Sequence, residues 1–273
     1  MPSPVSGLFV ATSLAALATL TAAPAGPPAV SAQGRPVARL SCGAYEAVPS
    51  GVGQSGHPTR LSIQRDGRLL QTVSDWWITR VDCSDIENDN TPELLVASYS
   101  GGAHCCETLR VWTLEPKAPR RILEYEAGNA GGFELRDVDG NGRLELLLGD
   151  DSFAYFDDLS YACSPRRFPL VACSGATGWL DCTRQFPEVL RPALAGYVDQ
   201  LAPVGSDDAR LQTVKGAALG VLALSVLLGE EEAGLETVRR AVASDDVMKW
   251  LERARPKVRD WAQTRSRKLK TTK

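Results

Sequence analysis

The stretch Asp137-Val138-Asp139-Gly140-Asn141-Gly142-Arg143-Leu144-Glu145 runs directly into the apolar Leu146–Leu148. Carboxylate or amide oxygens stand at its positions 1, 3, 5 and 9, and a glycine stands at position 6. Calcium takes six to eight oxygen ligands at about 2.3–2.6 Å, and glycine permits the sharp bend that returns position 9 to the ion. We therefore predict a calcium loop whose ligands are the side chains of Asp137, Asp139, Asn141 and Glu145 and the peptide oxygen of Arg143.

This loop differs from an EF-hand in two respects. An EF-hand carries a bidentate Glu at position 12, where this chain has Leu148. An EF-hand loop is also followed by a helix, whereas Leu146–Leu148 closes on Gly149 and indicates a short buried strand. The pattern is that of a calcium loop within a β-hairpin.

A second copy of the pattern, Asp85–Glu93, lies 52 residues earlier and is followed by Leu94-Leu95-Val96. The residues that align with the ligands of the later loop are Asp85, Glu87, Asp89 and Glu93. Asn90 takes the place of the glycine, which is tolerable because Asn accepts positive φ, but Glu87 is long for position 3. We predict a weaker second site here. The alternative for both loops is an acidic surface hairpin that binds no metal.

At these residues the chain resembles the FG-GAP and VCBS-type repeats, the integrin-α-like β-propeller blades of many secreted bacterial proteins. Their hairpin reads D-x-[DN]-x-[DN]-G-x-x-[DE] before an apolar strand, which residues 137–145 match and residues 85–93 match more loosely. The resemblance covers roughly residues 60–160. It implies propeller-like sheets, bound calcium and a binding role.

The remaining pattern of residues 38–160 predicts many short antiparallel strands. Leu61–Gln64 and Leu69–Val73 flank the tight-turn signal Arg65-Asp66-Gly67-Arg68. Further strands are predicted at Trp76–Val81, Leu94–Tyr99, Leu109–Leu114, Ile122–Tyr125, Phe133–Leu135 and Leu144–Leu148. About 125 residues hold only two to three blades, so we expect a partial propeller or a compact pile of sheets.

After residue 186 the sequence becomes helical. Pro187–Pro203 indicates a linker or first helix, and the next helix is predicted over Leu211–Leu228, ended by Gly229. Two more helices are predicted over Glu230–Ala243 and Asp245–Lys270. Leu211–Leu228 is apolar nearly all round, which indicates the buried centre of a small bundle, with membrane insertion as the alternative. The fold class is α+β: a β repeat domain over 35–185 and a helical domain over 186–273.

Two features indicate export from the cytoplasm. Residues 1–34 have an apolar run from Leu8 to Ala23 and then Val30-Ser31-Ala32, typical of a cleaved leader, with a disordered or membrane-anchoring segment as the alternative. All seven cysteines lie after the leader and outside the last third of the chain, which favours disulfides with at least one cysteine left over. We predict a secreted, periplasmic or cell-envelope protein with no transmembrane span in the mature chain.

The composition and motifs narrow the functional classes. With 44% hydrophobic residues and a net charge of −3, the chain is not a dedicated nucleic-acid binder. His104 lies in Gly101-Gly102-Ala103-His104-Cys105-Cys106, which favours a structural disulfide with a nearby histidine over a Cys–His nucleophile. Trp76, Trp77 and Trp112 are predicted to be packing residues rather than a sugar platform.

We therefore expect a non-enzymatic, calcium-stabilised binding protein whose partner is a protein or an anionic envelope polymer. The basic C-terminal tail is either a solvated helix face or the surface that contacts such a polymer. The alternative function is an exported hydrolase that uses His104 or a cluster of four aspartates: Asp150, Asp151, Asp157 and Asp158. Because the sequence offers no paired base and nucleophile, a solvated hairpin edge is the favoured interpretation of these aspartates.

Overall fold

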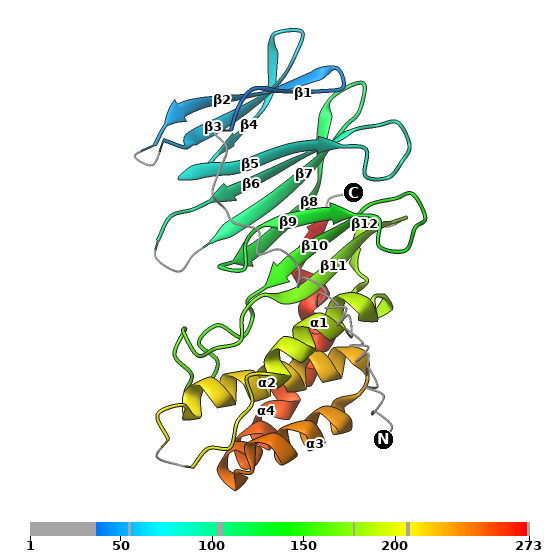
Figure 1. Ribbon diagram of the computed structural model, residues 1–273. Coiled ribbons are helices and arrows are strands. Elements are labelled where there is room, and N and C mark those ends of the chain that lie inside the picture. Colours follow the sequence, from blue (N-terminus) through cyan, green and yellow to red (C-terminus); the bar gives the residue numbers. More distant parts are fainter. Residues whose placement is uncertain (1–36, 54–55, 103–105, 177, 206–207, 272–273) are drawn as a thin grey trace, which may run out of the picture.

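The computed structural model describes residues 37–53, 56–102, 106–176, 178–205 and 208–271. Within these residues three antiparallel sheets are stacked one above another, and a group of helices lies beyond the third (Figure 1). The first sheet contains β1 (Leu40–Cys42), β2 (Tyr45–Val52), β3 (Pro58–Arg65) and β4 (Arg68–Ser74). The second contains β5 (Trp77–Ser84), β6 (Glu93–Tyr99), β7 (Glu107–Leu114) and β8 (Pro119–Gly128). The third contains β9 (Phe133–Arg136), β10 (Glu145–Asp150), β11 (Phe168–Gly175) and β12 (Gly178–Asp181).

The first and third sheets are four-stranded meanders in which consecutive strands are neighbours, and β5–β8 follow the same order in the second sheet. A fifth strand, β13 (Leu269–Thr271), extends the second sheet beside β8. The predicted hairpin is present, since β3 and β4 pair and Asp66 and Gly67 take the positive φ values of 51° and 73° that a tight turn requires. Three such sheets agree with the expectation of a few blade-like units, and among the described residues they do not close into a ring.

The second sheet is buried on both faces. Along β6 the side chains alternate: Leu94 and Val96 pack toward the first sheet, and Leu95 and Ala97 pack toward the third. Because successive residues of a strand point to opposite faces, a strand between two sheets is apolar throughout, as this one is. The apolar layers on its two faces hold the stack together.

The helices are α1 (Pro187–Val198), α2 (Leu211–Leu228), α3 (Glu231–Val242) and α4 (Asp245–Thr264). The predicted bounds of α2 are confirmed, and Gly229 ends it in the left-handed conformation at φ 75°. It is the one described helix long and apolar enough to cross a bilayer, and 72% of it is buried inside the fold. Its side chains form the centre of the helical core, with Phe153 and Phe168 contributed by the β region.

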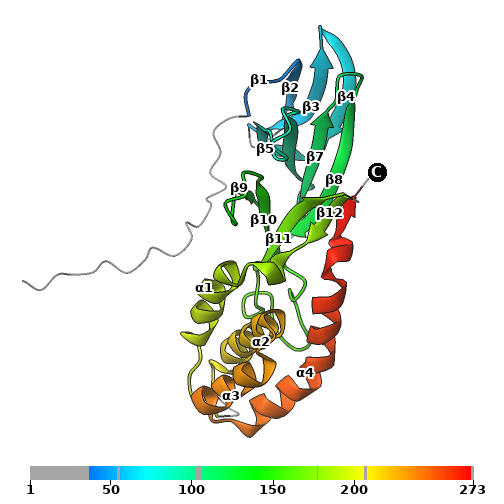
Figure 2. The ribbon, with the colours of Figure 1, turned by 90° about the vertical axis from the view of Figure 1, so that its right-hand side faces the viewer.

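The C-terminal prediction needs correction. The helix predicted to reach Lys270 ends at Thr264, and a short 3-10 helix, η2 (Arg265–Lys268), follows it. The chain then forms β13 (Leu269–Thr271), which pairs with β8 and places Leu269 opposite Tyr125 (Figure 2). Leu269 is buried in the core between the second and third sheets, so the tertiary contact outweighs the helical tendency of this basic segment.

Disulfides connect parts of the stack, as the cysteine pattern predicted. Cys42–Cys83 ties β1 to β5 and so joins the first and second sheets. Cys173–Cys182 ties β11 to the residue that follows β12. Cys106 is also disulfide-bonded, whereas Cys163 is a free thiol.

The tryptophan prediction is confirmed at two positions and wrong at a third. Trp112 is buried between the first two sheets, and Trp77 stacks on Tyr99 of the neighbouring strand, with ring centroids 5.4 Å apart. Trp76 is 57% exposed. It precedes β5, and its ring covers Gly101 on the surface instead of entering the core.

Candidate metal-binding loops

The loop 137–145 joins β9 to β10 and is shaped by hydrogen bonds from its own backbone to its own side chains. The two carboxylate oxygens of Asp137 accept from the N–H groups of Asn141 (3.0 Å) and Gly142 (2.9 Å). Glu145 reaches back and accepts from the N–H of Val138 at 2.8 Å. The bend needs two left-handed residues, which are Gly140 (φ 74°) and Gly142 (φ 85°).

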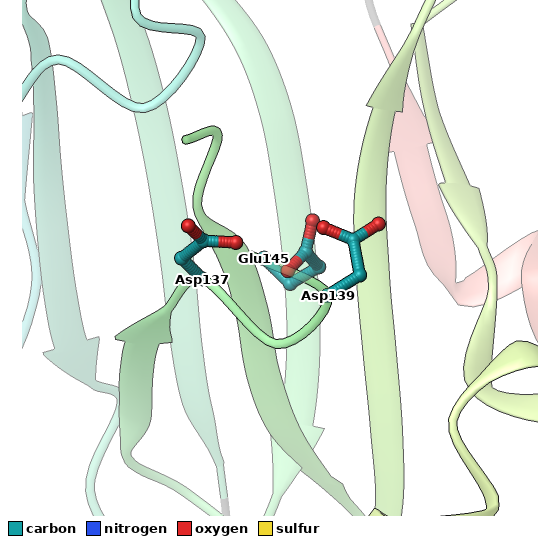
Figure 3. A group of neighbouring side chains, drawn as sticks. All are labelled: Asp137, Asp139 and Glu145. Carbon is teal, nitrogen blue, oxygen red and sulfur yellow. The ribbon is translucent and has the colours of Figure 1, made fainter. Parts of the chain in front are cut away.

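These bonds bring three carboxylates together. Asp137, Asp139 and Glu145 each offer an oxygen within 4.8 Å of the others, and the three side chains lie on the same side of the loop (Figure 3). Asp137 and Asp139 are exposed, whereas Glu145 is 4% exposed beneath the turn. Within the described part of the chain, no other group of His, Cys, Asp and Glu side chains comes together in this way.

The remaining two predicted ligands also take part in the loop. Asn141 donates from its amide to Asp139 at 2.9 Å and accepts from the N–H of Arg143 at 2.7 Å. These contacts keep Asn141 beside the carboxylates. Arg143 enters the network through its N–H, and the ligand role of its peptide oxygen stays a prediction.

The loop 85–93 joins β5 to β6 and has the same hydrogen-bond frame 52 residues earlier. Asp85 accepts from the N–H groups of Asp89 (3.0 Å) and Asn90 (2.8 Å), and Glu93 accepts from the N–H of Ile86 at 2.9 Å. Asn90 takes φ 68°, the conformation that Gly142 takes in the other loop. The predicted alignment of the two loops is therefore confirmed at the level of backbone geometry.

The two loops differ in the side chain at position 3. In the later loop it is Asp139, which stays within the loop and joins the carboxylate group. In the earlier loop it is Glu87, whose longer side chain leaves the loop and accepts a hydrogen bond from Ser174 on β11. The earlier loop has the frame without the third converging carboxylate. Sequence reasoning noted the length of Glu87 but had no signal for Ser174, which lies 87 residues away.

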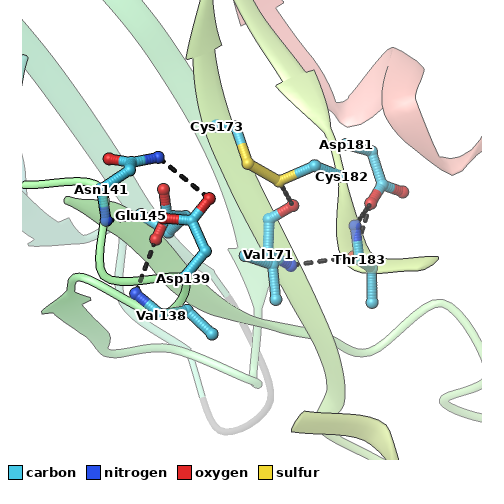
Figure 4. The surroundings of a disulfide bond; sticks show 9 residues. All are labelled: Val138, Asp139, Asn141, Glu145, Val171, Cys173, Asp181, Cys182 and Thr183. Carbon is cyan, nitrogen blue, oxygen red and sulfur yellow. Dashed lines mark hydrogen bonds between the residues drawn. A yellow bond between two sulfur atoms is a disulfide. The ribbon is translucent and has the colours of Figure 1, made fainter. Parts of the chain in front are cut away.

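The loops lie against each other and against a disulfide. The N–H of Leu144 donates to the carbonyl of Ile86 at 2.9 Å, and a side chain at Gly142 would come within 3.2 Å of Asn88. Figure 4 shows the later loop beside β11 and the Cys173–Cys182 bridge, where Val138 packs against the bridge. The loop is thus held by packing on a cross-linked hairpin as well as by its own hydrogen bonds.

Glu93, at the end of the loop 85–93, has a raised pKa. Its side chain is 2% exposed, and burial, together with the nearby charges of Glu87 and Asp89, raises its pKa to about 7. The N–H of Ile86 and the hydroxyl of Thr113 oppose the shift by favouring the charged form.

The four aspartates of the hydrolase alternative do not form a common site. Asp151 accepts from the N–H of Asn129 at 2.8 Å, Asp157 accepts from Trp250 Nε1 at 2.7 Å, and Asp158 pairs with Lys215 at 2.6 Å. Each of these three carboxylates therefore has a structural role, because it connects the segment that follows β10 to a different part of the fold. His104 lies outside the described residues.

The prediction of a solvated hairpin edge is wrong for Asp150. It is the last residue of β10 and is fully buried. Lys268 approaches one carboxylate oxygen at 2.7 Å, and Arg265 lies 3.8 Å from the other. Burial acts to raise the pKa of Asp150, but Lys268 and Arg265 more than offset it and hold the pKa below its usual range. Sequence periodicity has no signal for partners more than 110 residues away.

The basic tail is largely engaged within the fold. Arg255 pairs with Glu231, Glu232 and Glu252, and Arg259 also pairs with Glu231. Lys268 holds Asp150, and Lys270 pairs with Glu126 at 2.5 Å. The prediction of a solvated face is therefore wrong for Arg255 and Lys268, whose side chains are 17% and 31% exposed. It is confirmed for Arg259 and Lys270, whose side chains stay more than half exposed.

Comparison with known proteins finds two distant similarities. The chain is 32% identical over 192 residues to a protein of Synechocystis described as a probable thylakoid lumen protein; the match covers 68% of this chain and 55% of that protein. It is 38% identical over 64 residues to an uncharacterized protein of Sinorhizobium fredii, of which the match covers 10%. The chain thus spans little more than half of one relative and a tenth of the other. No protein-family model matches the chain, and no solved structure matches it significantly.

Proposed function

We propose that this protein is an exported, non-enzymatic binding protein built on FG-GAP-like repeats, and that the loop 137–145 binds calcium. The observation that carries the proposal is the convergence of Asp137, Asp139 and Glu145 to within 4.8 Å on a loop framed by its own hydrogen bonds. Calcium favours hard oxygen donors of this kind in a short curled loop.

The hydrogen bonds within the loop do not use all the acceptor capacity of the carboxylates, so the oxygens can still bind a cation. A carboxylate offers about four lone-pair sites, and each hydrogen bond from the backbone uses one of them. Asp137 accepts two such bonds, and Glu145 accepts one. The carboxylates therefore keep acceptor capacity while the backbone fixes their direction.

Charge supports the same proposal. Three neighbouring carboxylates repel one another at neutral pH, and this repulsion opposes the folded hairpin. A divalent cation reverses the sign of that interaction and stabilises the folded state by binding it selectively. For the loop 85–93 we propose weaker binding, because Glu87 is drawn away to Ser174.

Export is supported by the disulfides and by one relative. Disulfides persist in oxidising compartments, and this chain holds Cys42–Cys83 and Cys173–Cys182. The Synechocystis relative is described as a protein of the thylakoid lumen. We propose a secreted, periplasmic or cell-envelope location, with a leader within residues 1–34.

The proposed partner is a protein or an envelope polymer. The ion pairs of Arg255, Arg259, Lys268 and Lys270 reduce the charge that the C-terminal segment can offer to an anionic polymer. A pull-down from the envelope fraction, with and without calcium, tests for the partner directly.

The two loops supply a matched test of calcium binding. Asp137→Ala and Asp85→Ala each remove a carboxylate that accepts two backbone N–H bonds, so in chelator both variants should lose comparable stability. In millimolar calcium the parent protein should gain about 2.7 kcal/mol when calcium exceeds Kd a hundredfold. Asp85→Ala should keep most of that gain, and Asp137→Ala should lose it. Identical melting of the parent protein in calcium and in chelator would contradict the metal assignment.

A further inference from the structure

A cavity of about 590 Å³ lies between the segment 161–167, which precedes β11, and the helices α1 and α2. Its volume is in the range of about 300–1,000 Å³ that small-molecule sites occupy. None of its lining residues belongs to either acidic loop, and neither the calcium proposal nor the repeat resemblance uses it.

The charge of the cavity wall is positive. Arg166 and Arg167 line it, and none of its described lining residues is acidic. Neither arginine forms an ion pair in the described part of the chain, whereas Arg255, for comparison, is held by three glutamates. The guanidinium of Arg166 lies over the ring of Tyr161, 4.5 Å from its centroid, which restrains the side chain without neutralising it.

One half-buried acid, Glu107, lies close enough to interact electrostatically with Arg167 but does not form an ion pair with it. Burial raises the pKa of Glu107. The N–H of Gly132 and the charges of Arg167 and Arg80 favour the ionised form and only partly offset this effect.

The cavity wall is preformed by close packing. A Cβ at Gly216 of α2 would lie 1.8 Å from the carbonyl oxygen of Cys163, so the absence of a side chain lets the segment 161–167 approach the helix. A Cβ at Gly220 would lie 2.6 Å from the ring of Tyr197 on α1. The hydroxyl of Tyr197 donates to the carbonyl of Arg166 at 2.9 Å and ties the segment to α1. The backbone that carries the arginines is thereby fixed from two sides.

We propose that this cavity binds a small molecule that bears a carboxylate or phosphate group, and that Arg166 and Arg167 hold its oxyanion. The planar guanidinium matches the geometry of both groups and can donate two parallel hydrogen bonds to either. The apolar and aromatic parts of the wall, such as Tyr161 and Ala217, contact the remainder of the ligand.

The cavity contains its own reporter. Cys163 is the free thiol of the described cysteines and lines the cavity, with its sulfur 3.7 Å from the hydroxyl oxygen of Thr213. A ligand in the cavity covers this thiol. The rate of maleimide labelling of Cys163 in the full-length folded protein therefore measures occupancy, with Cys163→Ser as the blank.

The experiment titrates inorganic phosphate and succinate separately against that rate, with sodium chloride holding the ionic strength constant. We expect at least one of the two anions to protect Cys163 from labelling in a saturable way. The anion that protects at the lower concentration shows whether the cavity prefers a phosphate or a carboxylate group. In Arg166→Ala/Arg167→Ala the half-protecting concentration should rise about tenfold or more. Arg253→Ala, an exposed arginine on α4 that is absent from the cavity wall, should leave it unchanged.

Protection that neither anion produces, or that persists unchanged in the double arginine variant, would overturn the proposal. Both arginines are exposed, so their replacement should leave the fold intact. An unaltered melting temperature and an unaltered labelling rate without anion verify this. The readout involves no calcium, so its failure is distinct from failure of the calcium proposal.

Discussion

The carboxylate of Asp150 accepts a hydrogen bond from Trp261 Nε1 at 2.9 Å, across 111 positions of sequence. Asp150 ends β10 and Trp261 lies in the last turn of α4, so the bond joins the third sheet to the helical segment. Lys268 contacts the other carboxylate oxygen just before the chain enters β13. The buried carboxylate of Asp150 therefore holds the end of α4 and the segment that leads the C-terminus back to the second sheet.

Asp150→Asn should be severely destabilising. It removes the charge that pairs with Lys268 at 2.7 Å and one of the two that face the buried Arg265, which keeps Asp181 at 3.1 Å. Breaking one side of a buried ion pair costs about 3–5 kcal/mol. Urea unfolding measures the change. Asp158→Asn is the matched control, because Asp158 pairs with Lys215 at 54% side-chain exposure, and such pairs contribute about 0–1 kcal/mol. Equal effects of the two substitutions would show that Asp150 is not the anchor.

Glu93 should make stability fall as pH rises. Its pKa is raised to about 7 in the folded state from an ordinary value of 4.5, so the folded protein binds this proton more tightly than the unfolded chain. The stabilising contribution is present below pH 4.5 and is lost as pH rises toward 7, by about 3 kcal/mol at 1.4 kcal/mol per pKa unit.

Glu93→Gln tests this pH dependence. The substitution keeps an acceptor for the N–H of Ile86 but cannot ionise, so the difference in stability between parent and variant should change between pH 4.5 and 7. Chemical denaturation in chelator at several pH values measures it. A difference that stays constant over that range would contradict the assignment to Glu93.

The two disulfides should contribute unequally to stability. Cys42–Cys83 closes a loop of sequence separation 41, and Cys173–Cys182 closes one of 9. In the chain-entropy description these correspond to about 4 and about 2.5–3 kcal/mol. Paired Cys→Ser variants, compared by denaturant unfolding, should follow that order. The reverse order would mean that packing of the shorter bridge on Val138 outweighs loop length.

Thiol counting on the unreduced, denatured protein should find one reactive cysteine. The free thiol is Cys163, so Cys163→Ser should abolish the signal. Seven reactive thiols would contradict both the disulfides and the proposed export.

Local chemistry made part of this fold predictable. The ends of α2 follow from its apolar run and from Gly229, and the two loops were aligned because each ligand position needs a particular side chain. Even the substitution of Asn90 for glycine was interpretable, because Asn accepts the left-handed conformation.

Long-range partners account for what was not predictable. β13 is three residues of a basic segment that becomes a strand because β8 offers an edge and Leu269 enters a core. Glu87 leaves its loop because Ser174 is placed beside it by folding of the third sheet. Asp150 was assigned to a solvated edge because nothing adjacent in sequence reveals Lys268 or Trp261.

Glycine positions in two helices should respond oppositely to the same substitution. Alanine is favoured over glycine within helices by about 0.8–1.0 kcal/mol when nothing obstructs the added methyl group. Gly196 in α1 is exposed, and a Cβ there would have no neighbour within 4 Å, so Gly196→Ala should stabilise the protein by a comparable or smaller amount.

At Gly216 in α2 the Cβ would lie 1.8 Å from the carbonyl oxygen of Cys163, which is backbone and cannot rotate away. Gly216→Ala should therefore destabilise the protein despite its helix propensity, by about 1–3 kcal/mol as in other overpacked sites. Denaturant unfolding of both variants provides the comparison, and stabilisation by both would show that the segment 161–167 is not packed against α2.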